Sequence, residues 1–273
     1  MPLKLKSRAV EKPWGREDLP ELFPNPERRR IGEVWFEKAE GRELPLLVKY
    51  LFTSERLSIQ VHPNDAQARA HGLAGGKEEC WYILECDEGA SLGIGLTRTL
   101  LLPEVRAAIA DGSIEGLIRW RPVSRGDFFF IPAGTVHAIG AGITLVEIQQ
   151  NADVTYRLYD YGRPRALNLD EGLEVSRLSP YLLDPSHAAM GETRMLLEPG
   201  IAPFHVEMLS WRGGVSVRPG ARGRSWFIPL KGSGTIADQP FQPGECWLVD
   251  GADPIIGVDE GSALVAACSE PSA

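Results

Sequence analysis

Short apolar runs, bounded by glycine, proline and aspartate, recur along the whole chain. Runs of this length are typical of β-strands rather than of helices. They lie at residues 46–52, 81–84, 128–131, 143–149, 226–230 and 246–249. The pattern predicts a mostly β protein.

Helical periodicity is confined mainly to two short segments. One spans residues 103–111 and continues through Gly112 toward Ile118. The other spans residues 65–71, where the Asn64 side chain can cap the first turn. We expect both to be short helical excursions from a sheet.

A faint internal repeat organises these runs. Residues 79–84 and 125–131 have counterparts at residues 225–232 and 243–249. The repeat predicts two β-barrels along the chain.

The second copy lacks the side chains that could bind a metal in the first. Ser225 takes the position of Glu79, and no histidine follows Val249. We therefore expect the second barrel to have no metal ligands and to serve a structural role.

The boundary between the two barrels is expected between about residues 165 and 200. Residues 168–179 and 184–192 are polar and poorly periodic there. This predicts a first domain at residues 1–170, which carries the candidate metal ligands, and a second, degenerate β domain without metal ligands at residues 171–273.

Composition narrows the classes of partner. The 273 residues carry a formal net charge of -8, which disfavours nonspecific binding to nucleic acid and to acidic membranes. A local basic pocket for a phosphorylated substrate remains compatible with that charge. No apolar run approaches the ~20 residues of a membrane span, and residues 1–8 lack a following apolar segment of signal-peptide length. These features predict a cytoplasmic protein with a small-molecule partner.

Gln60 and His62 form the first half of a candidate site. Side chains two positions apart in a strand point to the same face, so both can reach one point while Val61 packs behind them. Glu79 opens the next apolar run, and His137 follows a Pro-Ala-Gly turn. Three antiparallel strands could therefore each bring a ligand to one interior point.

One amide, two imidazoles and one carboxylate make a donor set of oxygen and neutral nitrogen. This set suits Zn²⁺, Mn²⁺, Fe²⁺ or Ni²⁺ and requires no thiolate. The four cysteines form no CxxC pair and are expected to be reduced packing residues. His71, His187 and His205 lack comparable neighbours, and we expect packing or surface roles for them.

Several segments in order resemble the two motifs of the cupin superfamily. They are the strand that carries ligands, the variable excursion after it, and the later Gly-Asp-Phe and Pro-Ala-Gly-Thr-Val-His segments. In that superfamily a jelly-roll barrel binds a metal between the two motifs. The resemblance implies a bicupin, with two jelly-roll-like β-barrels and short helical excursions.

Four segments in order are similar to the type I mannose-6-phosphate isomerases, and the similarity covers roughly residues 12–165. The segments are residues 59–65, 77–82, 132–137 and 147–157. The family's zinc ligands then fall on Gln60, His62, Glu79 and His137, the same four residues that strand geometry selects. The resemblance implies one Zn²⁺ per chain and an enzyme that interconverts mannose 6-phosphate and fructose 6-phosphate.

The resemblance also implies roles for residues around the metal. Arg157 takes the position of the family's active-site arginine, and Glu147 that of an acidic residue facing the site. Lys77 stands just ahead of the ligand Glu79. The implied reaction moves a proton between C1 and C2 through a cis-enediol. Glu147, Lys77 with a depressed pKa, and a metal-bound water all remain candidates for the base.

Two further residues are candidates for substrate binding. Ser58 should share the face of Gln60 and could contact a phosphate oxygen. Arg163 could supply a second positive charge. The alternative is that Arg157 and Arg163 form ion pairs with Asp153 or Asp160 at the surface.

The chain departs from the family in two places. Glu78 stands where the family usually has a small hydroxyl residue, and it could pair with Lys77 or change the affinity for an anionic sugar. The excursion between Leu96 and Trp120 is short where larger members carry a helical domain.

These departures keep other functions open. One is a noncatalytic, metal-stabilised module that binds a sugar phosphate, and another is a cupin enzyme for a different sugar phosphate. A redox cupin with iron or nickel, and a bicupin whose metal only stabilises one barrel, are further alternatives.

Overall fold

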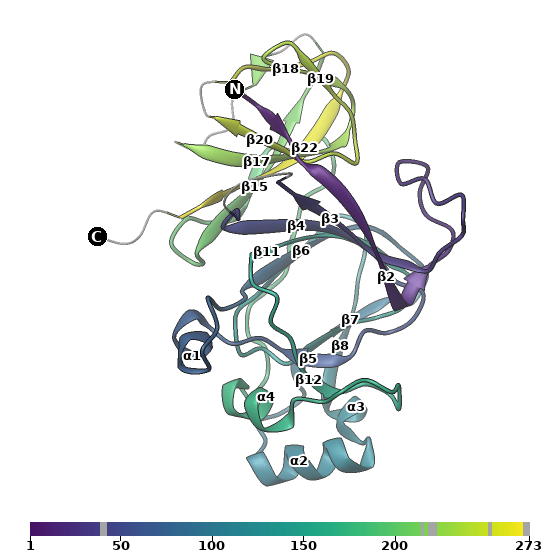
Figure 1. Ribbon diagram of the computed structural model, residues 1–273, viewed down its shortest axis with the longest axis vertical. Coiled ribbons are helices and arrows are strands. Elements are labelled where there is room, and N and C mark those ends of the chain that lie inside the picture. The colour runs from purple at the N-terminus through teal and green to yellow at the C-terminus, as the bar shows by residue number, and fades with distance from the viewer. Residues whose placement is uncertain (39–42, 214–215, 218–222, 251–252, 270–273) are drawn as a thin grey trace.

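The computed structural model describes residues 1–38, 43–213, 216–217, 223–250 and 253–269. Within these residues the chain forms β-sheets that lie as successive layers, with helices at the far end of the first half of the chain (Figure 1). This architecture confirms the prediction of a mostly β protein with short helical excursions.

Two antiparallel sheets form the first β unit. The larger has seven strands, in the spatial order β13 (Ser186–His187), β9 (Asp127–Ile131), β6 (Glu79–Cys86), β11 (Ile143–Gln150), β4 (Leu46–Phe52), β3 (Ile31–Glu37) and β2 (Lys6–Arg16). The smaller has five strands, in the order β12 (Tyr156–Tyr159), β5 (Ile59–Val61), β10 (His137–Ile139), β7 (Ser91–Leu96) and β8 (Ile118–Pro122).

Two further sheets form the second β unit. One has six strands, in the order β1 (Leu3–Lys4), β20 (Trp247–Asp250), β17 (Arg224–Lys231), β22 (Gly261–Cys268), β15 (Phe204–Trp211) and β14 (Arg194–Leu197). The other has four strands, in the order β16 (Ser216–Val217), β21 (Ile255–Gly257), β18 (Gly234–Ile236) and β19 (Gln239–Phe241). The first strand of the chain, β1, thus joins a sheet made otherwise of residues after 193.

Apolar side chains fill the space between each pair of neighbouring layers. Phe36 and Val48 of the seven-stranded sheet share one buried cluster with Phe204 and Leu264 of the six-stranded sheet. A second cluster lies between the seven- and five-stranded sheets, and a third between the six- and four-stranded sheets. The two β units therefore share a continuous core.

The predicted strands are found close to their expected bounds. Strand β4 has the bounds of the run 46–52, and strand β9 extends the run 128–131 by one residue. The repeated runs also occupy equivalent places in the two units. Strands β9, β6 and β11 are neighbours in the seven-stranded sheet, and β20, β17 and β22 are neighbours in the same order in the six-stranded sheet. The internal repeat is thus visible in the order of the strands.

The two predicted helical segments are also found. Helix α1 (Asp65–Ala70) begins after Asn64, whose side chain accepts a hydrogen bond from Gln67 while the Gln67 side chain accepts one from Asn64. Helix α2 (Leu102–Asp111) ends at Gly112, which adopts a left-handed φ of 80°. The chain therefore does not continue as one helix, and α3 (Ile114–Leu117) forms separately.

A fourth helix, α4 (Leu169–Val175), lies in a segment that the sequence indicates as poorly periodic. Its Leu173 and Val175 side chains are buried against the outer face of the five-stranded sheet. Helices α2 and α3 contribute to the same apolar cluster, so the helices cover that face of the sheet (Figure 1).

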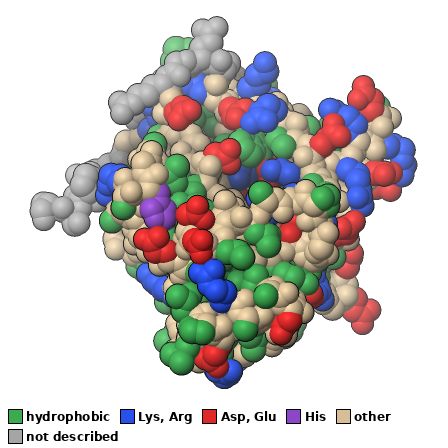
Figure 2. Space-filling model, turned by 60° about the horizontal axis from the view of Figure 1, so that its bottom comes forward, with side chains coloured by type: hydrophobic (Ala, Val, Ile, Leu, Met, Phe, Trp, Pro, Cys, Tyr) green, Lys and Arg blue, Asp and Glu red, His purple; other side chains and the backbone are tan. Residues whose placement is uncertain are grey.

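The surface over this end of the molecule is of mixed character. Acidic and basic side chains alternate with apolar ones on the face shown in Figure 2. Among the described residues, no helix combines the length and the apolar character that crossing a membrane would require.

Phe204→Ala is expected to lower the free energy of unfolding by about 3–5 kcal/mol, because the ring is fully buried between the two units. Ile201→Ala is the matched control, since that side chain is 58% exposed, and its effect should stay within about 0.5 kcal/mol. Urea denaturation measures both values. An equally small effect of Phe204→Ala would contradict a shared core.

Candidate active site

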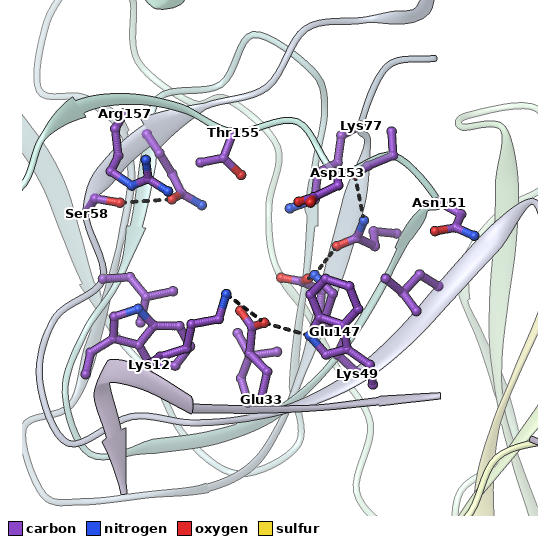
Figure 3. Close-up of a pocket in the computed structure, with 18 of the residues that line it drawn as sticks. Lys12, Glu33, Lys49, Ser58, Lys77, Glu147, Asn151, Asp153, Thr155 and Arg157 are labelled. Carbon is purple, nitrogen blue, oxygen red and sulfur yellow. Dashed lines mark hydrogen bonds and ion pairs between the residues drawn. The ribbon is translucent and has the colours of Figure 1, made fainter. Parts of the chain in front are cut away.

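Strand alternation gives the seven-stranded sheet two different faces. In β4, Val48, Tyr50 and Phe52 enter the core shared with the six-stranded sheet. Lys49 points to the opposite face and lines a cleft beside the five-stranded sheet (Figure 3). Charged side chains can thus occupy one face while the other face stays apolar.

The register between strands brings the predicted ligands together. His137 of β10 lies opposite Gln60 of β5, and Arg157 of β12 lies opposite Gln60 on the other side. Glu79 opens β6 on the facing sheet, where it pairs with Gln149 of β11. Residues from distant parts of the sequence therefore meet at one end of the two sheets.

A glycine turn fixes the spacing between His62 and His137. The Gly134 N–H donates to the His62 carbonyl oxygen at 2.8 Å, and the Gly134 carbonyl oxygen accepts from the Arg177 N–H at 2.7 Å. Gly134 has a φ of 83°, and a Cβ there would lie 2.9 Å from the Val175 carbonyl oxygen. The turn therefore requires glycine for both conformation and space.

His62, Glu79 and His137 form a compact, buried cluster. One potential ligand atom from each lies within 4.8 Å of the others. Nε2 of His62 lies 3.5 Å from Oε2 of Glu79, and Nε2 of His137 lies 3.4 Å from Oε1. Each of the three residues is at most 2% exposed. The strand argument from the sequence therefore agrees with the geometry for these three residues.

The imidazoles of the cluster are in the form that binds metals. Burial, together with the charge of Lys77, lowers the pKa of His62 to about 3. Burial also lowers the pKa of His137. Nδ1 of His137 lies 2.8 Å from the Thr135 carbonyl oxygen, so the assigned tautomer donates there and leaves Nε2 with a free lone pair toward Glu79.

The residues present fit a divalent metal ion. Both oxygens of Glu79 are buried and accept no well-aligned hydrogen bond from the described residues. Unsatisfied buried carboxylate oxygens are costly unless a cation compensates them. Two neutral imidazole nitrogens face the same point, and this combination of donors is one that zinc accepts.

Gln60 is the fourth predicted ligand and borders the same point. Its Nε2 lies 3.4 Å from Nε2 of His137, and its Oε1 accepts a hydrogen bond from the Ser58 hydroxyl at 3.1 Å. A rotation of the amide by half a turn would direct the oxygen at the cluster, and the Ser58 hydroxyl could then accept from the amide nitrogen. The Ser58 hydroxyl can therefore form a hydrogen bond with the Gln60 amide in either orientation.

Lys77 is buried against the cluster. Its Nζ lies 2.8 Å from Oε2 of Glu79 and 3.3 Å from Nε2 of His62. Burial alone would lower the pKa of Lys77, but the carboxylates of Glu79 and Glu147 outweigh burial and raise it. The expectation of a depressed pKa is therefore wrong, because the nearest groups are anionic. Conversely, burial alone would raise the pKa of Glu79, and the Lys77 ammonium instead holds it well below its ordinary value.

Glu147 lies across the cleft from Arg157 (Figure 3). Its Oε1 accepts from Lys49 Nζ at 2.9 Å, and its Oε2 accepts from Trp81 Nε1 at 3.2 Å. Lys49 also donates to Oε1 of Gln149 and lies over the Trp35 ring, 4.8 Å from its centroid. Lys49 is a cleft residue that sequence reasoning missed. Its signal was one lysine within an otherwise apolar strand.

Arg157 points into the cleft beside Ser58 (Figure 3). Its Nη1 lies 3.5 Å from the Ala166 carbonyl oxygen, and its Nε is buried without a hydrogen-bond partner among the described residues. Burial, together with the charge of Arg165, lowers the pKa of Arg157 below the ordinary arginine value. The guanidinium remains charged, so it can bind an anion.

Two other predicted residues lie elsewhere. Arg163 is not among the described residues that line the cleft, and its Nη2 lies 2.8 Å from Oδ1 of Asp160. The ion pair that the alternative names is therefore present, but with a buried carboxylate rather than at the surface. Glu78 lines a separate surface groove with Arg177, and its backbone pairs with Gln150. Lys77 therefore pairs with Glu79 rather than with Glu78.

His137→Ala is expected to weaken zinc binding strongly. Removal of a residue that only supports a metal ligand can lower the affinity roughly 10–100-fold, and removal of the ligand itself should cost more. His187→Ala is the matched control, because His187 is an exposed histidine whose ring pairs with Asp127. Zinc titration of both variants, with metal analysis of the purified proteins, gives the comparison. Equal affinity in the two variants would exclude His137 as a ligand.

Known proteins resemble the chain in sequence. The family model "Phosphomannose isomerase type I, catalytic domain" matches residues 4–102. Mannose-6-phosphate isomerase ManA of Bacillus subtilis is 44% identical over 158 residues, which cover 53% of this chain and 50% of that protein. The chain thus spans about half the length of this curated relative.

Solved structures resemble the chain in fold. The crystal structure of the mannose 6-phosphate isomerase from Bacillus subtilis has a TM-score of 0.82 and 27% identity, and the match covers 97% of this chain and 99% of that one. A zinc-bound mannose 6-phosphate isomerase has a TM-score of 0.71 at 15% identity, covering 98% of this chain and 100% of that one, and it supports the fold alone. Residues 4–102 thus match the catalytic domain of the type I phosphomannose isomerases, and the fold of the chain is similar to that of a mannose 6-phosphate isomerase.

Proposed function

We propose that the protein is a metal-dependent aldose–ketose isomerase that interconverts mannose 6-phosphate and fructose 6-phosphate. The observation that carries this proposal is the buried His62–Glu79–His137 cluster, which Gln60 and Lys77 connect to a cleft lined by cations. The names of the relatives, which are mannose-6-phosphate isomerases, support the same substrate.

The local charge of the cleft suits an anionic sugar. Its lining residues include five cations and three carboxylates, although the whole chain has a net charge of -8. The cations are Lys12, Lys49, Lys77, Arg157 and Arg165. A positive cleft in an acidic protein attracts a phosphorylated substrate without a general affinity for polyanions.

We propose zinc as the cofactor, held by His62, Glu79, His137 and the oxygen of Gln60. When bound there, Zn²⁺ would act as a Lewis acid that stabilises negative charge developing on the C1 and C2 oxygens. The zinc-bound neighbour is compatible with this choice. The Thr135 carbonyl oxygen orients the ring of His137, and with the Gln60 oxygen turned toward the metal the Ser58 hydroxyl could accept from the Gln60 amide nitrogen.

We assign proton transfer between C1 and C2 to Glu147. Its carboxylate lines the cleft, and Lys49 and Trp81 hold its two oxygens in place, each of which keeps a lone pair. Lys77 is better suited to compensating negative charge than to moving the proton, because its ammonium faces Glu79 and His62. A positioned base of this kind contributes ~10²–10⁴-fold to a rate.

We propose that Arg157 supports the anionic substrate. An arginine without a carboxylate partner can donate two parallel hydrogen bonds to a phosphate or an enediolate. Ser58 lies beside it on the same wall (Figure 3).

The two β units fit a bicupin, with the metal centre in the first unit and a metal-free second unit. We propose residues 1–170 and 171–273 as the catalytic and degenerate domains, with three exchanges between the units: β1 joins a sheet of the second unit, and α4 and β13 pack with the first. The cytoplasmic location and the absence of nucleic-acid and membrane partners remain predictions from the sequence.

Isomerisation of mannose 6-phosphate should disappear after chelation and return after zinc is added back. The purified protein is assayed in all three states, with its metal content determined on the same samples. Mannose without phosphate serves as the control substrate. Bound metal without turnover would contradict the isomerase, and turnover that survives complete metal removal would contradict the metal.

Arg157→Ala is expected to lower kcat/KM by ~10²–10³-fold while the bound metal stays near one per chain. The reason is that Arg157 contacts the proposed substrate but does not touch the metal cluster. Arg106→Ala is the matched control, because Arg106 is exposed and pairs with Asp170. Retained activity in Arg157→Ala would remove Arg157 from the site, and loss of metal would indicate a structural role.

A further inference from the structure

Four of the five cations that line the cleft have a carboxylate partner. The pairs, with their shortest nitrogen–oxygen distances, are Lys12 with Glu33 (3.2 Å), Lys49 with Glu147 (2.9 Å), Lys77 with Glu79 (2.8 Å) and Arg165 with Asp160 (2.6 Å). Arg157 has no ion pair within the part of the chain that the structure describes. One side of the cleft therefore carries positive charge that the described residues do not neutralise.

Arg165 is held rigidly on the same side. Nε and Nη2 of Arg165 donate to the two oxygens of Asp160 at 2.6 Å and 2.7 Å. The Asp160 side chain is 2% exposed, whereas that of Arg165 is 25% exposed. A bidentate pair with a buried carboxylate fixes the plane of a guanidinium and leaves its remaining N–H groups directed outward.

The segment that carries Arg165 folds back onto the strand that carries Arg157. The Asn168 N–H donates to the Arg157 carbonyl oxygen at 2.8 Å, and the Asn168 side chain accepts from the Arg157 N–H at 3.3 Å. The Arg157 guanidinium also reaches the Ala166 carbonyl oxygen. The two arginines are therefore anchored to one small substructure.

We propose that Arg165 is a substrate-contacting residue that binds the phosphate group of the sugar together with Arg157, and that Asp160 is its positioning residue. This inference rests on the proposed function and names the second guanidinium of that same site. It replaces Arg163, which shares Asp160 but does not line the cleft among the described residues.

The charge balance supports the assignment. Asp160 is bound by Arg163 as well as by Arg165, so one buried carboxylate serves two guanidiniums. Arg157 adds a third positive charge, and Arg165 and Arg163 lower its pKa while Asp160 and Asp153 raise it. Glu55 lies 3.8 Å from Arg163 and is not among the described residues that line the cleft, and a phosphate carrying up to two negative charges would offset the repulsion between Arg157 and Arg165.

The test compares Arg165→Met with Arg163→Met and Arg106→Met in the zinc-loaded protein. Each variant loses one guanidinium and keeps an unbranched side chain. We expect Arg165→Met to raise KM for mannose 6-phosphate, and to weaken its binding in calorimetry, by roughly 10–100-fold with little change in kcat. Arg106→Met should match the unmodified protein, and Arg163→Met should change KM by less than about 3-fold.

Asp160→Asn tests the positioning role. Asp160→Asn should raise KM for mannose 6-phosphate, as Arg165→Met does. The double variant with both substitutions should bind mannose 6-phosphate no more weakly than Arg165→Met alone, because Asp160 acts through Arg165. Thermal unfolding of every variant identifies any that fail to fold, and Arg165→Lys then replaces Arg165→Met, with a smaller expected rise in KM because the charge remains.

The outcomes separate this inference from the proposed function. Normal turnover with an unchanged KM in Arg165→Met would overturn the inference and leave the isomerase intact. Binding of mannose 6-phosphate without turnover, weakened in Arg165→Met, would overturn the isomerase and support the inference. A loss confined to Arg163→Met would overturn the assignment, and failure of the unmodified protein to bind the sugar phosphate would overturn both.

Discussion

The buried carboxylate of Glu79 is the interaction on which the site depends. An ionised carboxylate that is 1% exposed is tolerated only where cations or strong donors surround it. Lys77 supplies one charge at 2.8 Å, and His62 and His137 leave a point where a metal ion can supply the rest. Removal of any one of these groups leaves the others as uncompensated buried polar atoms. The site is therefore a set of interdependent charges within a rigid pair of sheets.

The seven-stranded sheet supports this set because its two faces are separated by strand alternation. Val48 and Val146 pack into the core shared with the second unit, while Lys49 and Glu147 from the same strands pair on the cleft side. Packing with the six-stranded sheet thus fixes the strand backbones, and the backbones fix the charged side chains. Apolar packing on one face of the sheet therefore fixes the positions of the charged side chains on the cleft face.

Local features could be predicted from the sequence, because a few neighbouring residues determine them. The two-residue period of a strand is sufficient to put Gln60 and His62 on one face, and the Asn64 cap needs only Gln67 three residues later. Features that depend on long-range contacts could not be predicted. Lys49 sits within an apolar run and is explained only by Glu147, which is 98 residues away. Which arginine after β12 faces the cleft depends on the turn that Asp160 organises, and helix α4 depends on burial against a sheet formed earlier in the chain.

The second β unit has the same strand order as the first but lacks the buried carboxylates of the candidate site. Ser225 of β17 pairs with β20 and β22, as Glu79 of β6 pairs with β9 and β11. By the same register, Phe227 corresponds to Trp81 and Val265 to Glu147, and both lie in an apolar cluster. The positions of Glu79 and Glu147 thus hold a hydroxyl or an apolar side chain here, and Lys49 corresponds by the same register to Glu207. Without those two buried carboxylates, no buried cation is needed to compensate them. A structural role for the second unit remains a prediction, and the candidate metal ligands found among the described residues lie in the first unit.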